Sequence, residues 1–593
     1  MKKPLSSSSF LKQHPRWSSG DLRIPCLFFL AALLLAVPLS FFSDVPERDV
    51  AVRYASMAEE FAAGNWAYAF HPRVPIFHST VCGILVRLFG ISGFTAAKII
   101  SVISYSLAVF PLYAVMKRVF DTRIAAGALF IYVVNPLMIR SSFGGLREST
   151  KCLLLIMMVH AILLIREKTH SGTGFLYLSA SAGLAMITRS EMILFCGLVL
   201  WGAMIWETLA RQDMRRNFDG AAPESNSTRA KPSALPLYSF AGTFLTDAIV
   251  FIPAVVNYAV FGFPTPETRY LVIFETIFGR MPSLPDAVLI AVFVPFAMMA
   301  PAMLLARGIP RKYHKPVLLV FAGVFIAGYL AMFFREAFIE EWDNVKDFLL
   351  LIGDTFNLFW SLPALICLAV RFRSGTFSSL EKLLLAFIVM HTLVITGQNM
   401  AYEHTLAFSA RYLHPVSPLG FGWTFYGFML LAGFICRFVL RQHLPVRTAM
   451  IALLGVYTFY GLLRGIEPVL RDHFKPKDVA VRHGTFRLAE IFRANRPAHS
   501  RAAAPPLDLI SYEGSAVPGV YFERTSKYCV SAYLAGGRVV QNMEQADFYV
   551  TVPRQPEEKP APPPGEGWLP LEEKVPMGVN RESVVYFRKE AEL

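Results

Sequence analysis

Long apolar runs separated by short polar loops fill the first 463 residues of the chain. The runs recur from Ile24 to Leu463, and most are close to twenty residues long. A helix rises about 1.5 Å per residue, so about twenty residues cross a hydrocarbon core of roughly 30 Å. The pattern predicts a polytopic α-helical membrane domain over residues 1–463 with about thirteen spans, at residues 24–43, 94–116, 124–139, 151–165, 173–188, 191–208, 238–260, 286–306, 316–334, 347–370, 381–397, 414–436 and 448–463.

Basic residues in the loops predict the orientation of these spans. Five of them precede the first run, which is long for a signal peptide and has no small-residue cleavage pattern after it. We therefore expect a retained first span with its N-terminus in the cytoplasm. Later basic clusters fall on the same side, and an odd number of spans puts the C-terminus outside.

The segment Pro75 to Gly90 is apolar but too short to cross comfortably. We interpret it as a juxtamembrane or half-inserted helix on the outer side. If it crosses instead, the basic clusters that follow it move to the outer side.

The composition becomes polar after about residue 464. A helix is expected over Lys477 to Arg496, and short strands are expected at Leu507–Ser511, Val520–Phe522, Ala546–Val552 and Ser583–Phe587. Residues 464–593 are thus predicted to form a small extracytoplasmic α/β domain. A proline-rich loop at 553–565 interrupts it, because proline cannot join the interior of a sheet.

Composition agrees with the membrane class. The 593 residues are 54% hydrophobic and only 17% charged, which excludes one soluble core. The net charge of +14 lies mainly in short loops between spans, where it sets topology, so nucleic acid is not an expected partner. The seven cysteines show no metal-ligand spacing and no disulfide framework.

The loop after the first span carries the first candidate chemistry. Glu47 and Asp49 precede a short helix in which Tyr54, Met57, Ala58 and Phe61 share one face, and we expect that face to lie on the membrane. Asp49 at the start of this helix has two interpretations. It caps the free amides, as acids often do there, or it is a general base that takes a proton from an acceptor hydroxyl.

Two arginines further along are candidate phosphate ligands. Arg73 lies in the same loop, and Arg411 comes just before Tyr412, where a late span enters the bilayer from outside. Guanidinium binds phosphate oxygens at two points and keeps its charge. The alternatives are a snorkelling arginine for Arg73 and an interfacial anchor for Arg411 and Tyr412.

These residues resemble a known family. Asp49, Tyr54 and Ala58, Gly64, Arg73 and Pro75, and Phe89-Gly90 are similar to the first outer loop of GT-C superfamily membrane glycosyltransferases. The closest branch holds protein O-mannosyltransferases, aminoarabinose transferases of lipid A, and the glycosyltransferase family 39 or RgtA-like proteins. The resemblance implies that the loop 44–93 is catalytic, that an early acid is the base, that Arg73 binds the lipid phosphate, and that Arg411-Tyr412 opens a late span. Glu47 and Asp49 are separated here, whereas the branch often has an acid pair, and we favour Asp49 for its spacing to Tyr54.

Other charged residues are weaker candidates. Arg147 and Glu148 lie in the next outer turn and could contact donor or acceptor, although Glu148 with Lys151 also has the spacing of a plain surface pair. Arg189 and Glu191 are expected to form an ion pair at a tight turn. Asp354 and His391 fall within predicted spans, where ionisable groups suggest function.

The resemblance predicts transfer of a sugar from a polyprenyl-phosphate donor to an outer hydroxyl, with inversion, in the inner membrane of a bacterium. The acceptor could be a protein, a glycolipid or a polysaccharide. No cofactor is required in principle once guanidinium pairs with the phosphate. The acids Glu340, Glu341 and Asp343 would suit a divalent cation, but their spacing matches no specific cation loop, and we favour a solvated outer loop there. The rival functions are a transporter or flippase of lipid-linked sugars, which predicts repeats and broken helices, and a non-catalytic assembly subunit.

Overall fold

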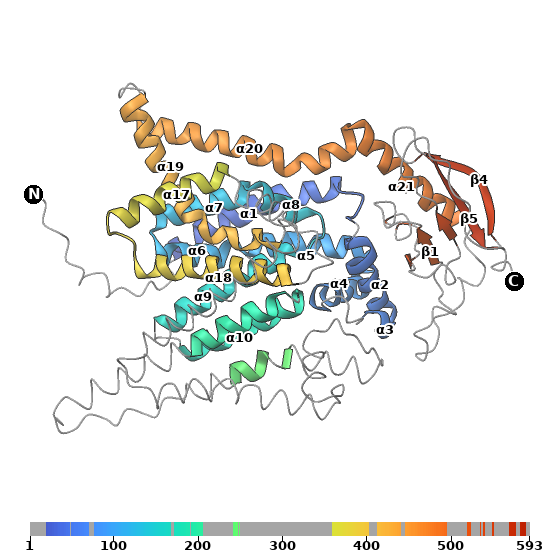
Figure 1. Ribbon diagram of the computed structural model, residues 1–593, viewed down its shortest axis with the longest axis horizontal. Coiled ribbons are helices and arrows are strands. Elements are labelled where there is room, and N and C mark those ends of the chain that lie inside the picture. The colour runs from blue at the N-terminus through green and yellow to red at the C-terminus, as the bar shows by residue number, and fades with distance from the viewer. Residues whose placement is uncertain are drawn as a thin grey trace, which may run out of the picture.

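The computed structural model describes the helical part of the chain and short stretches of its C-terminal region. The described residues are 19–47, 49–69, 76–167, 171–189, 191–204, 241–246, 248–249, 358–401, 412–439, 445–494, 519–522, 530, 534, 538–539, 548–550, 568–576 and 582–588. Figure 1 shows a bundle of helices with a sheet at one end, beside the C-terminus.

The helices follow the predicted spans closely where they are described. Six are long and apolar enough to cross a membrane, or seven if a bent pair counts as one, among the residues described. The predicted spans at 286–306 and 316–334, and most of 238–260, lie outside that part of the chain. Helix bounds are α1 Ser19–Phe42, η1 Val50–Ala55, α2 Ser56–Ala63, α3 Trp66–Ala69, α4 Ile76–Phe89, α5 Gly93–Leu107, α6 Val109–Val119, α7 Thr122–Val134, α8 Pro136–Phe143, α9 Glu148–Arg166, α10 Ser171–Thr188, an unlabelled helix Met192–Met204, α17 Leu358–Arg373, α18 Ser379–Ala401, η5 His414–Gly420, α19 Phe421–Phe434, η6 Ile435–Val439, α20 Val446–Phe474 and α21 Pro476–Ala494.

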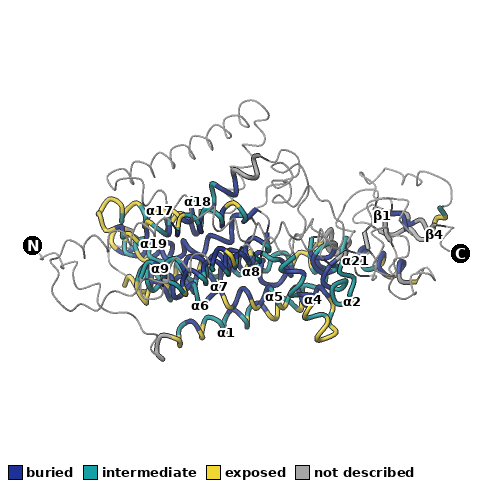
Figure 2. The backbone as a smooth tube through the Cα atoms, turned by 90° about the horizontal axis from the view of Figure 1, so that it is seen from below, coloured by how far each residue is buried: buried dark blue, intermediate teal, exposed yellow. Residues whose placement is uncertain are grey.

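Helix α1 runs along the edge of the bundle, and the inner helices are buried (Figure 2). Its outer face exposes Leu27, Leu30 and Leu34, whereas Ala32 and Ala36 are buried against the bundle. This division is typical of a helix with lipid on one side and protein on the other.

The helix pair α7 and α8 is bent by 56°. Pro136 begins α8 and has no amide hydrogen to continue the α7 ladder. The Asn135 side chain accepts from the amides of Leu137 and Met138 at 3.0 and 3.4 Å, and it donates to the Tyr457 hydroxyl at 3.1 Å. The bend therefore has its polar groups satisfied inside the bundle.

Helix α4 corresponds to the short apolar segment that was expected not to cross comfortably. It spans 14 residues and is not among the candidate membrane spans. It packs against α2 and α5, so it belongs to the same layer as the first outer loop.

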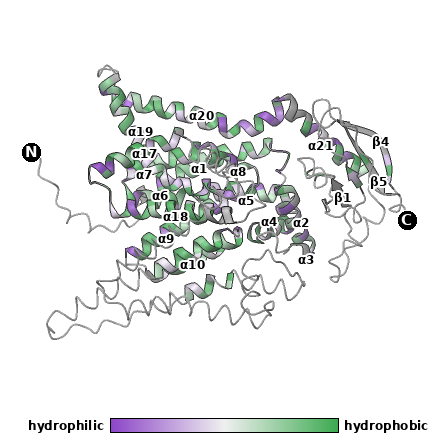
Figure 3. Ribbon diagram, in the orientation of Figure 1, coloured by the Kyte–Doolittle hydropathy of each residue, from purple (hydrophilic) through white to green (hydrophobic). Residues whose placement is uncertain are grey.

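Helix α20 leaves the bundle and leads through α21 to the C-terminal sheet (Figure 1). Its hydropathy changes from hydrophobic at its start to hydrophilic toward α21 (Figure 3). At about 1.5 Å per residue its 29 residues extend roughly 43 Å, longer than a hydrocarbon core of about 30 Å.

The sheet has the strand order β2-β1-β3-β5-β4, with β1 Gly519–Phe522, β2 Arg538–Val539, β3 Phe548–Val550, β4 Trp568–Pro576 and β5 Glu582–Arg588. Strand β1 pairs in parallel with β2 and β3, and β5 pairs antiparallel with β3 and β4. Strands β1, β3 and β5 overlap the predicted ones, β2 and β4 were not predicted, and Leu507–Ser511 lies outside the described residues. The predicted helix 477–496 corresponds to α21.

Candidate active site

Asp49 occupies the position just before η1, but its side chain makes no capping hydrogen bond there. The capping interpretation is therefore wrong for Asp49. The amides of Val50 and Ala51 instead donate to the backbone carbonyl of Glu47, both at 2.9 Å. The Asp49 side chain is 22% exposed and pairs with Arg53, one turn on, at 3.8 Å, whereas Glu47 is exposed. Asp49 thus remains the candidate base, at the start of a structured segment.

The apolar face of this segment packs on protein, which corrects the expectation that it lies on the membrane. Tyr54, Met57 and Ala58 are 3%, 3% and 0% exposed, in a cluster with residues of α4 and α5. Phe61 is half-buried and its ring lies 4.8 Å from that of Trp66. The periodicity identified the buried face correctly, but the partner is α4 and α5.

Two glycines allow other elements to approach this loop closely. A Cβ on Gly93, the first residue of α5, would collide with the carbonyl oxygen of Ala55, and the Gly93 amide donates to the Glu59 carboxylate at 2.8 Å. Gly145 has a φ of +75°, and a Cβ there would lie 3.3 Å from Val50 Cγ1. The loop is therefore held by the start of α5 and by the turn that precedes α9.

Tyr54 lies between this loop and the next outer turn. The guanidinium of Arg147 lies 4.9 Å from the centre of the Tyr54 ring, and the His78 ring meets the ring edge-on at 5.7 Å. Burial raises the pKa of the Tyr54 hydroxyl, and the charges of Arg147, Arg189, Glu148 and Asp49 all act on it. Tyr54 is thus within electrostatic range of the candidate base on one side and of a group of arginines on the other.

His78 of α4 is hydrogen-bonded to the Gly145 turn. Its Nε2 is 3.3 Å from the Gly145 carbonyl oxygen, and the side chain is fully buried. Burial, together with Arg147, lowers the pKa of His78 to about 4. The ring is therefore neutral near pH 7 and donates from Nε2 to that carbonyl.

Five charged side chains meet beneath Tyr54 and form what we call the buried charge cluster: Arg147, Glu148, Lys151, Arg189 and Glu191. Arg189 pairs with both Glu148 and Glu191, and Lys151 lies 3.8 Å from Glu191. Four of the residues are 0% to 8% exposed, and Arg147 is half-buried. The expected Arg189–Glu191 ion pair is confirmed, but the interpretation of Glu148 and Lys151 as a plain surface pair is wrong, because both are buried and each pairs with a residue of the next turn.

The cluster carries net positive charge. Burial opposes ionisation of Glu191, but Arg189, Lys151 and Arg147 outweigh it and lower the pKa of the carboxyl to about 2. Burial likewise opposes the charge of Arg189, yet Glu191 and Glu148 raise the pKa of its guanidinium. Three cations against two carboxylates leave one net positive charge.

Arg147 has hydrogen-bonding capacity left over. Its Nη1 donates to the Thr188 carbonyl at 3.0 Å, whereas its buried Nε has no hydrogen-bond partner among the described residues. A buried donor without a partner is costly in a finished structure. An anionic ligand oxygen at this point would satisfy it.

The late element predicted to open a span reaches the same place. Lys151 Nζ donates to the Tyr412 carbonyl at 2.9 Å, and the Arg189 guanidinium lies 4.3 Å from the centre of the Tyr412 ring. Tyr412 and Tyr54 therefore each lie against one arginine of the cluster. Arg411 and Arg73 are outside the described residues, so their predicted roles as phosphate ligands stay predictions.

The sequence did not single out Lys151, Arg189, Glu191 or His78 as site residues. Arg189, Glu191 and Lys151 were named there, but as members of an ion pair and a surface pair, and the rule that an ionisable group within a span suggests function was used for Asp354 and His391. His391 on α18 is fully buried, its ring lies 5.0 Å from that of Phe195, and neither ring nitrogen has a hydrogen-bond partner in the described part of the chain. Asp354 is outside it.

A metal site does not emerge from the described residues. No group of three or more histidine, cysteine, aspartate or glutamate side chains that could hold an ion occurs among them. The acids Glu340, Glu341 and Asp343 lie outside that part.

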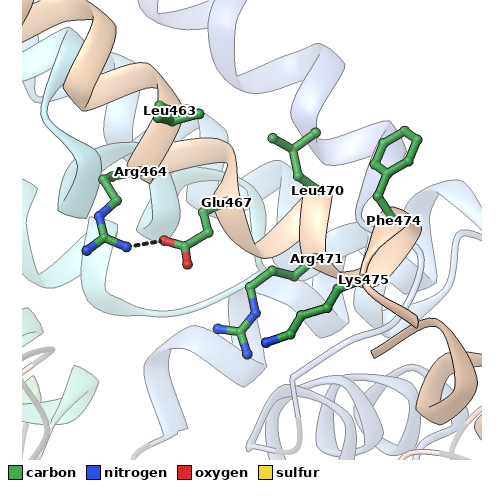
Figure 4. Close-up of a pocket in the computed structure, with 7 residues that line it drawn as sticks. All are labelled: Leu463, Arg464, Glu467, Leu470, Arg471, Phe474 and Lys475. Atoms are coloured by element: carbon green, nitrogen blue, oxygen red, sulfur yellow. Dashed lines mark hydrogen bonds and ion pairs between the residues drawn. The ribbon is translucent and has the colours of Figure 1, made fainter. Parts of the chain in front are cut away.

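A hollow of about 520 Å³ lies elsewhere, at the far end of α20. Figure 4 shows its lining residues Leu463, Arg464, Glu467, Leu470, Arg471, Phe474 and Lys475, with Arg464 paired to Glu467 at 2.9 Å. Arg140, in the last turn of α8, reaches this place and pairs with Glu467 at 3.1 Å. None of the buried charge cluster lines the hollow, so we place no chemistry in it.

Comparison with known proteins finds one matching family model, over part of the chain, and solved structures with the same fold. The family described as dolichyl-phosphate-mannose-protein mannosyltransferase matches residues 73–218, which include Arg147, Glu148, Lys151, Arg189 and Glu191. No curated protein sequence matches the chain.

Solved structures of an oligosaccharyltransferase from Archaeoglobus fulgidus share the fold. The form in complex with an inhibitory peptide and a dolichol-phosphate is 13% identical to this chain, with a TM-score of 0.51. The alignment covers 89% of this chain and 66% of the oligosaccharyltransferase chain. The form tethered to an acceptor peptide with the NVT sequon is 15% identical, with a TM-score of 0.51. Its alignment covers 88% of this chain and 64% of the oligosaccharyltransferase chain. This chain thus spans slightly less than two thirds of their length. ArnT from Cupriavidus metallidurans in the apo state aligns over 97% of this chain and 99% of its own length at 15% identity, with a TM-score of only 0.37.

The family match and the shared fold confirm the resemblance to GT-C membrane glycosyltransferases drawn from the sequence. The helices also confirm an integral membrane protein.

Proposed function

We propose that this chain transfers a sugar from a polyprenyl-phosphate donor to a hydroxyl of an acceptor, with inversion at the anomeric carbon. One observation carries the proposal: Tyr54 lies against Arg147 of a buried cluster with net positive charge and within electrostatic range of the half-buried carboxylate of Asp49. A base and an anion site at one place are what such a transfer needs.

The donor phosphate binds on the cationic side. Arg147 and Lys151 supply the positive charge, and the unpartnered Nε of Arg147 supplies a donor for a phosphate oxygen. Arg73 and Arg411 add guanidinium groups in this proposal. The archaeal neighbour, whose structure contains a dolichol-phosphate, supports a lipid-phosphate donor.

The reaction is balanced without a cofactor. The acceptor hydroxyl gives its proton to the Asp49 carboxylate, and its oxygen forms a bond to the anomeric carbon. The bond from that carbon to the phosphate oxygen breaks on the opposite face, and the lipid phosphate leaves with the electron pair. Guanidinium charge stabilises the leaving phosphate, which is the role a metal ion plays in other transferases.

In this proposal the chain lies in the inner membrane of a bacterium, with its N-terminus in the cytoplasm and both the loop 44–93 and the C-terminal region on the outer side. The acceptor is a protein, a glycolipid or a polysaccharide. Glu47 is the alternative base, but its exposure and its distance from Tyr54 in sequence favour Asp49.

The experiment compares Asp49→Asn with Glu47→Gln in membranes that contain a radiolabelled lipid-linked sugar. Loss of a general base lowers the rate by about 10²- to 10⁴-fold, and we expect this for Asp49→Asn alone. Transfer at the wild-type rate by Asp49→Asn would remove Asp49 from the mechanism.

A transporter or flippase is the alternative that one observation favours. The bend of 56° between α7 and α8 is the broken helix that such proteins use. At this bend, however, the Asn135 side chain accepts from two amides of α8 and donates to Tyr457, which is the work of a helix cap. Scrambling of the lipid-linked sugar across proteoliposomes without any transfer would favour this function.

A further inference from the structure

The outer end of α1 is held by two cations from distant parts of the chain. Lys98 of α5 donates from Nζ to the carbonyl oxygens of Ser40 and Ser43, at 2.8 and 3.0 Å. These are among the last carbonyls of α1, which a cation stabilises. Asp44, the next residue, is bound by Arg482 of α21.

The contact between Arg482 and Asp44 has a forked geometry. Arg482 Nε lies 3.2 and 3.1 Å from the two carboxylate oxygens, and Nη2 donates to Oδ2 as well. The two side chains are 24% and 35% exposed. Exposed ion pairs are usually weak, but a guanidinium that engages both oxygens holds a defined orientation.

Helix α21 packs against the C-terminal sheet. Its Phe492 is fully buried and its ring lies 5.0 Å from that of Phe548 in β3, and α21 also packs against β4. The bond to Asp44 therefore joins the C-terminal unit to the membrane bundle across 438 residues of sequence.

Asp49 follows Asp44 by only five positions, with four residues between them. Pro46, between them, is buried, and Val50 is fully buried in a cluster with Ala97 and Leu146, beside the Gly145 turn. The short segment is thus fixed at both ends, at Asp44 by Arg482 and at Val50 by its burial in this cluster. Loss of the Arg482 contact would release the Asp44 end of this segment and widen the range of positions open to the Asp49 carboxylate.

We propose that Arg482 is a positioning residue: through Asp44 it holds the segment that carries Asp49, and so couples the C-terminal unit to the catalytic loop. This rests on the proposed function. The donor site lies on the buried charge cluster, which Arg482 does not touch, so loss of the bond affects the orientation of the base and leaves donor binding intact.

The test uses the full chain with Arg482→Gln, Asp44→Asn and the double variant, each assayed for transfer and for hydrogen exchange. We expect kcat to fall about tenfold, less than the roughly 10²-fold that a misplacement of 1 Å can produce, with the donor KM within about twofold of wild type. The double variant should be no worse than either single one, since both remove the same bond. Arg482→Lys should recover part of the rate.

Hydrogen exchange gives a readout that does not depend on activity. Amides of residues 45–56 should exchange faster in Arg482→Gln, while those of α21 and the sheet keep wild-type protection. If the proposed transfer is absent in the wild-type protein, the exchange result still decides whether Arg482 orders this segment.

Arg487→Gln is the matched control. It breaks an exposed pair with Glu490 on the same helix, at 3.2 Å, that does not reach the loop, and we expect wild-type rate and exchange. Wild-type exchange in 45–56 for Arg482→Gln would overturn the proposal. So would faster exchange throughout α21 and the sheet, because Arg482 would then stabilise only its own unit.

Discussion

Arg147 lies with its guanidinium 4.9 Å from the centre of the Tyr54 ring, and this contact joins the loop after α1 to the turn before α9. Arg147 also donates to the Thr188 carbonyl at 3.0 Å. One planar cation therefore stacks on a ring, binds a backbone oxygen and keeps its Nε available for a ligand.

Arg147→Lys should impair donor binding more than Tyr54→Phe does. Lysine keeps the charge but loses the planar fork, so we expect the donor KM to rise by about tenfold or more, which corresponds to roughly 1.4 kcal/mol. Tyr54→Phe keeps the ring under the cation and should stay within about threefold of wild type. Steady-state transfer at varied donor concentration checks both. An unchanged donor KM in Arg147→Lys would show that the phosphate binds elsewhere.

Gly145→Ala should lower both stability and transfer. The residue has a φ of +75°, and the new Cβ would lie 3.2 Å from Ala97 Cβ and 3.3 Å from Val50 Cγ1. The conformation alone costs about 1–2 kcal/mol, and the contact with Val50 shifts the residue next to Asp49. Thermal unfolding in detergent and a transfer assay measure the two effects.

Gly64→Ala is the control for that change. Gly64 has a φ of +85°, and nothing lies within 4 Å of its would-be Cβ. The Gly64→Ala variant should lose about as much stability as Gly145→Ala, because both strain the backbone, but it should keep the wild-type transfer rate. Equal loss of transfer in the two variants would mean that strain, rather than the contact with Val50, is responsible.

Local patterns predicted the elements of this site better than its contacts. The face of Tyr54, Met57 and Ala58 was identified from periodicity, but a periodic face does not reveal whether lipid or protein covers it. Glu148 and Lys151 have the spacing of a surface pair, yet their partners Arg189 and Glu191 come from about forty residues further on. No spacing rule within one helix contains that information.

The missed strands have a similar cause. Strand β4 contains Pro570 and the charged run Glu572 to Lys574, and its pairing with β5 shifts register between Pro570 and Lys574. An edge strand with an irregularity tolerates proline and charge, which removes the alternation that predicts a strand.

Glu191→Gln should destabilise the protein at neutral pH and make its folding stability depend less on pH in the acid range. The folded pKa of about 2 lies below the ordinary value of 4.5. The ionised carboxylate therefore contributes its full stability above about pH 4.5, and the contribution is lost as the pH falls from 4.5 through 2. Breaking a buried pair on one side costs about 3–5 kcal/mol. Melting temperatures of both proteins between pH 7 and pH 3 give the difference.

An exposed pair serves as the reference for this measurement. Glu490, 61% exposed beside Arg487, lies on α21. Glu490→Gln should change stability by less than about 0.5 kcal/mol at any of these pH values. If Glu191→Gln behaves like Glu490→Gln, the cluster does not depend on its carboxylates.

Chelation of divalent cations should leave transfer intact. In the proposed mechanism the phosphate is neutralised by Arg147 and Lys151 of the buried charge cluster, together with Arg73 and Arg411, and these groups keep their charge in the presence of EDTA. We expect the transfer rate with EDTA to stay within about twofold of the rate with added Mg²⁺ or Mn²⁺. The triple variant Glu340→Gln, Glu341→Gln, Asp343→Asn distinguishes neutralisation of the phosphate by basic side chains from neutralisation by a metal ion, because it removes the acids that would suit a cation. A loss of transfer both in EDTA and in this variant, restored by metal only in the wild-type protein, would assign the phosphate to a metal ion rather than to the arginines.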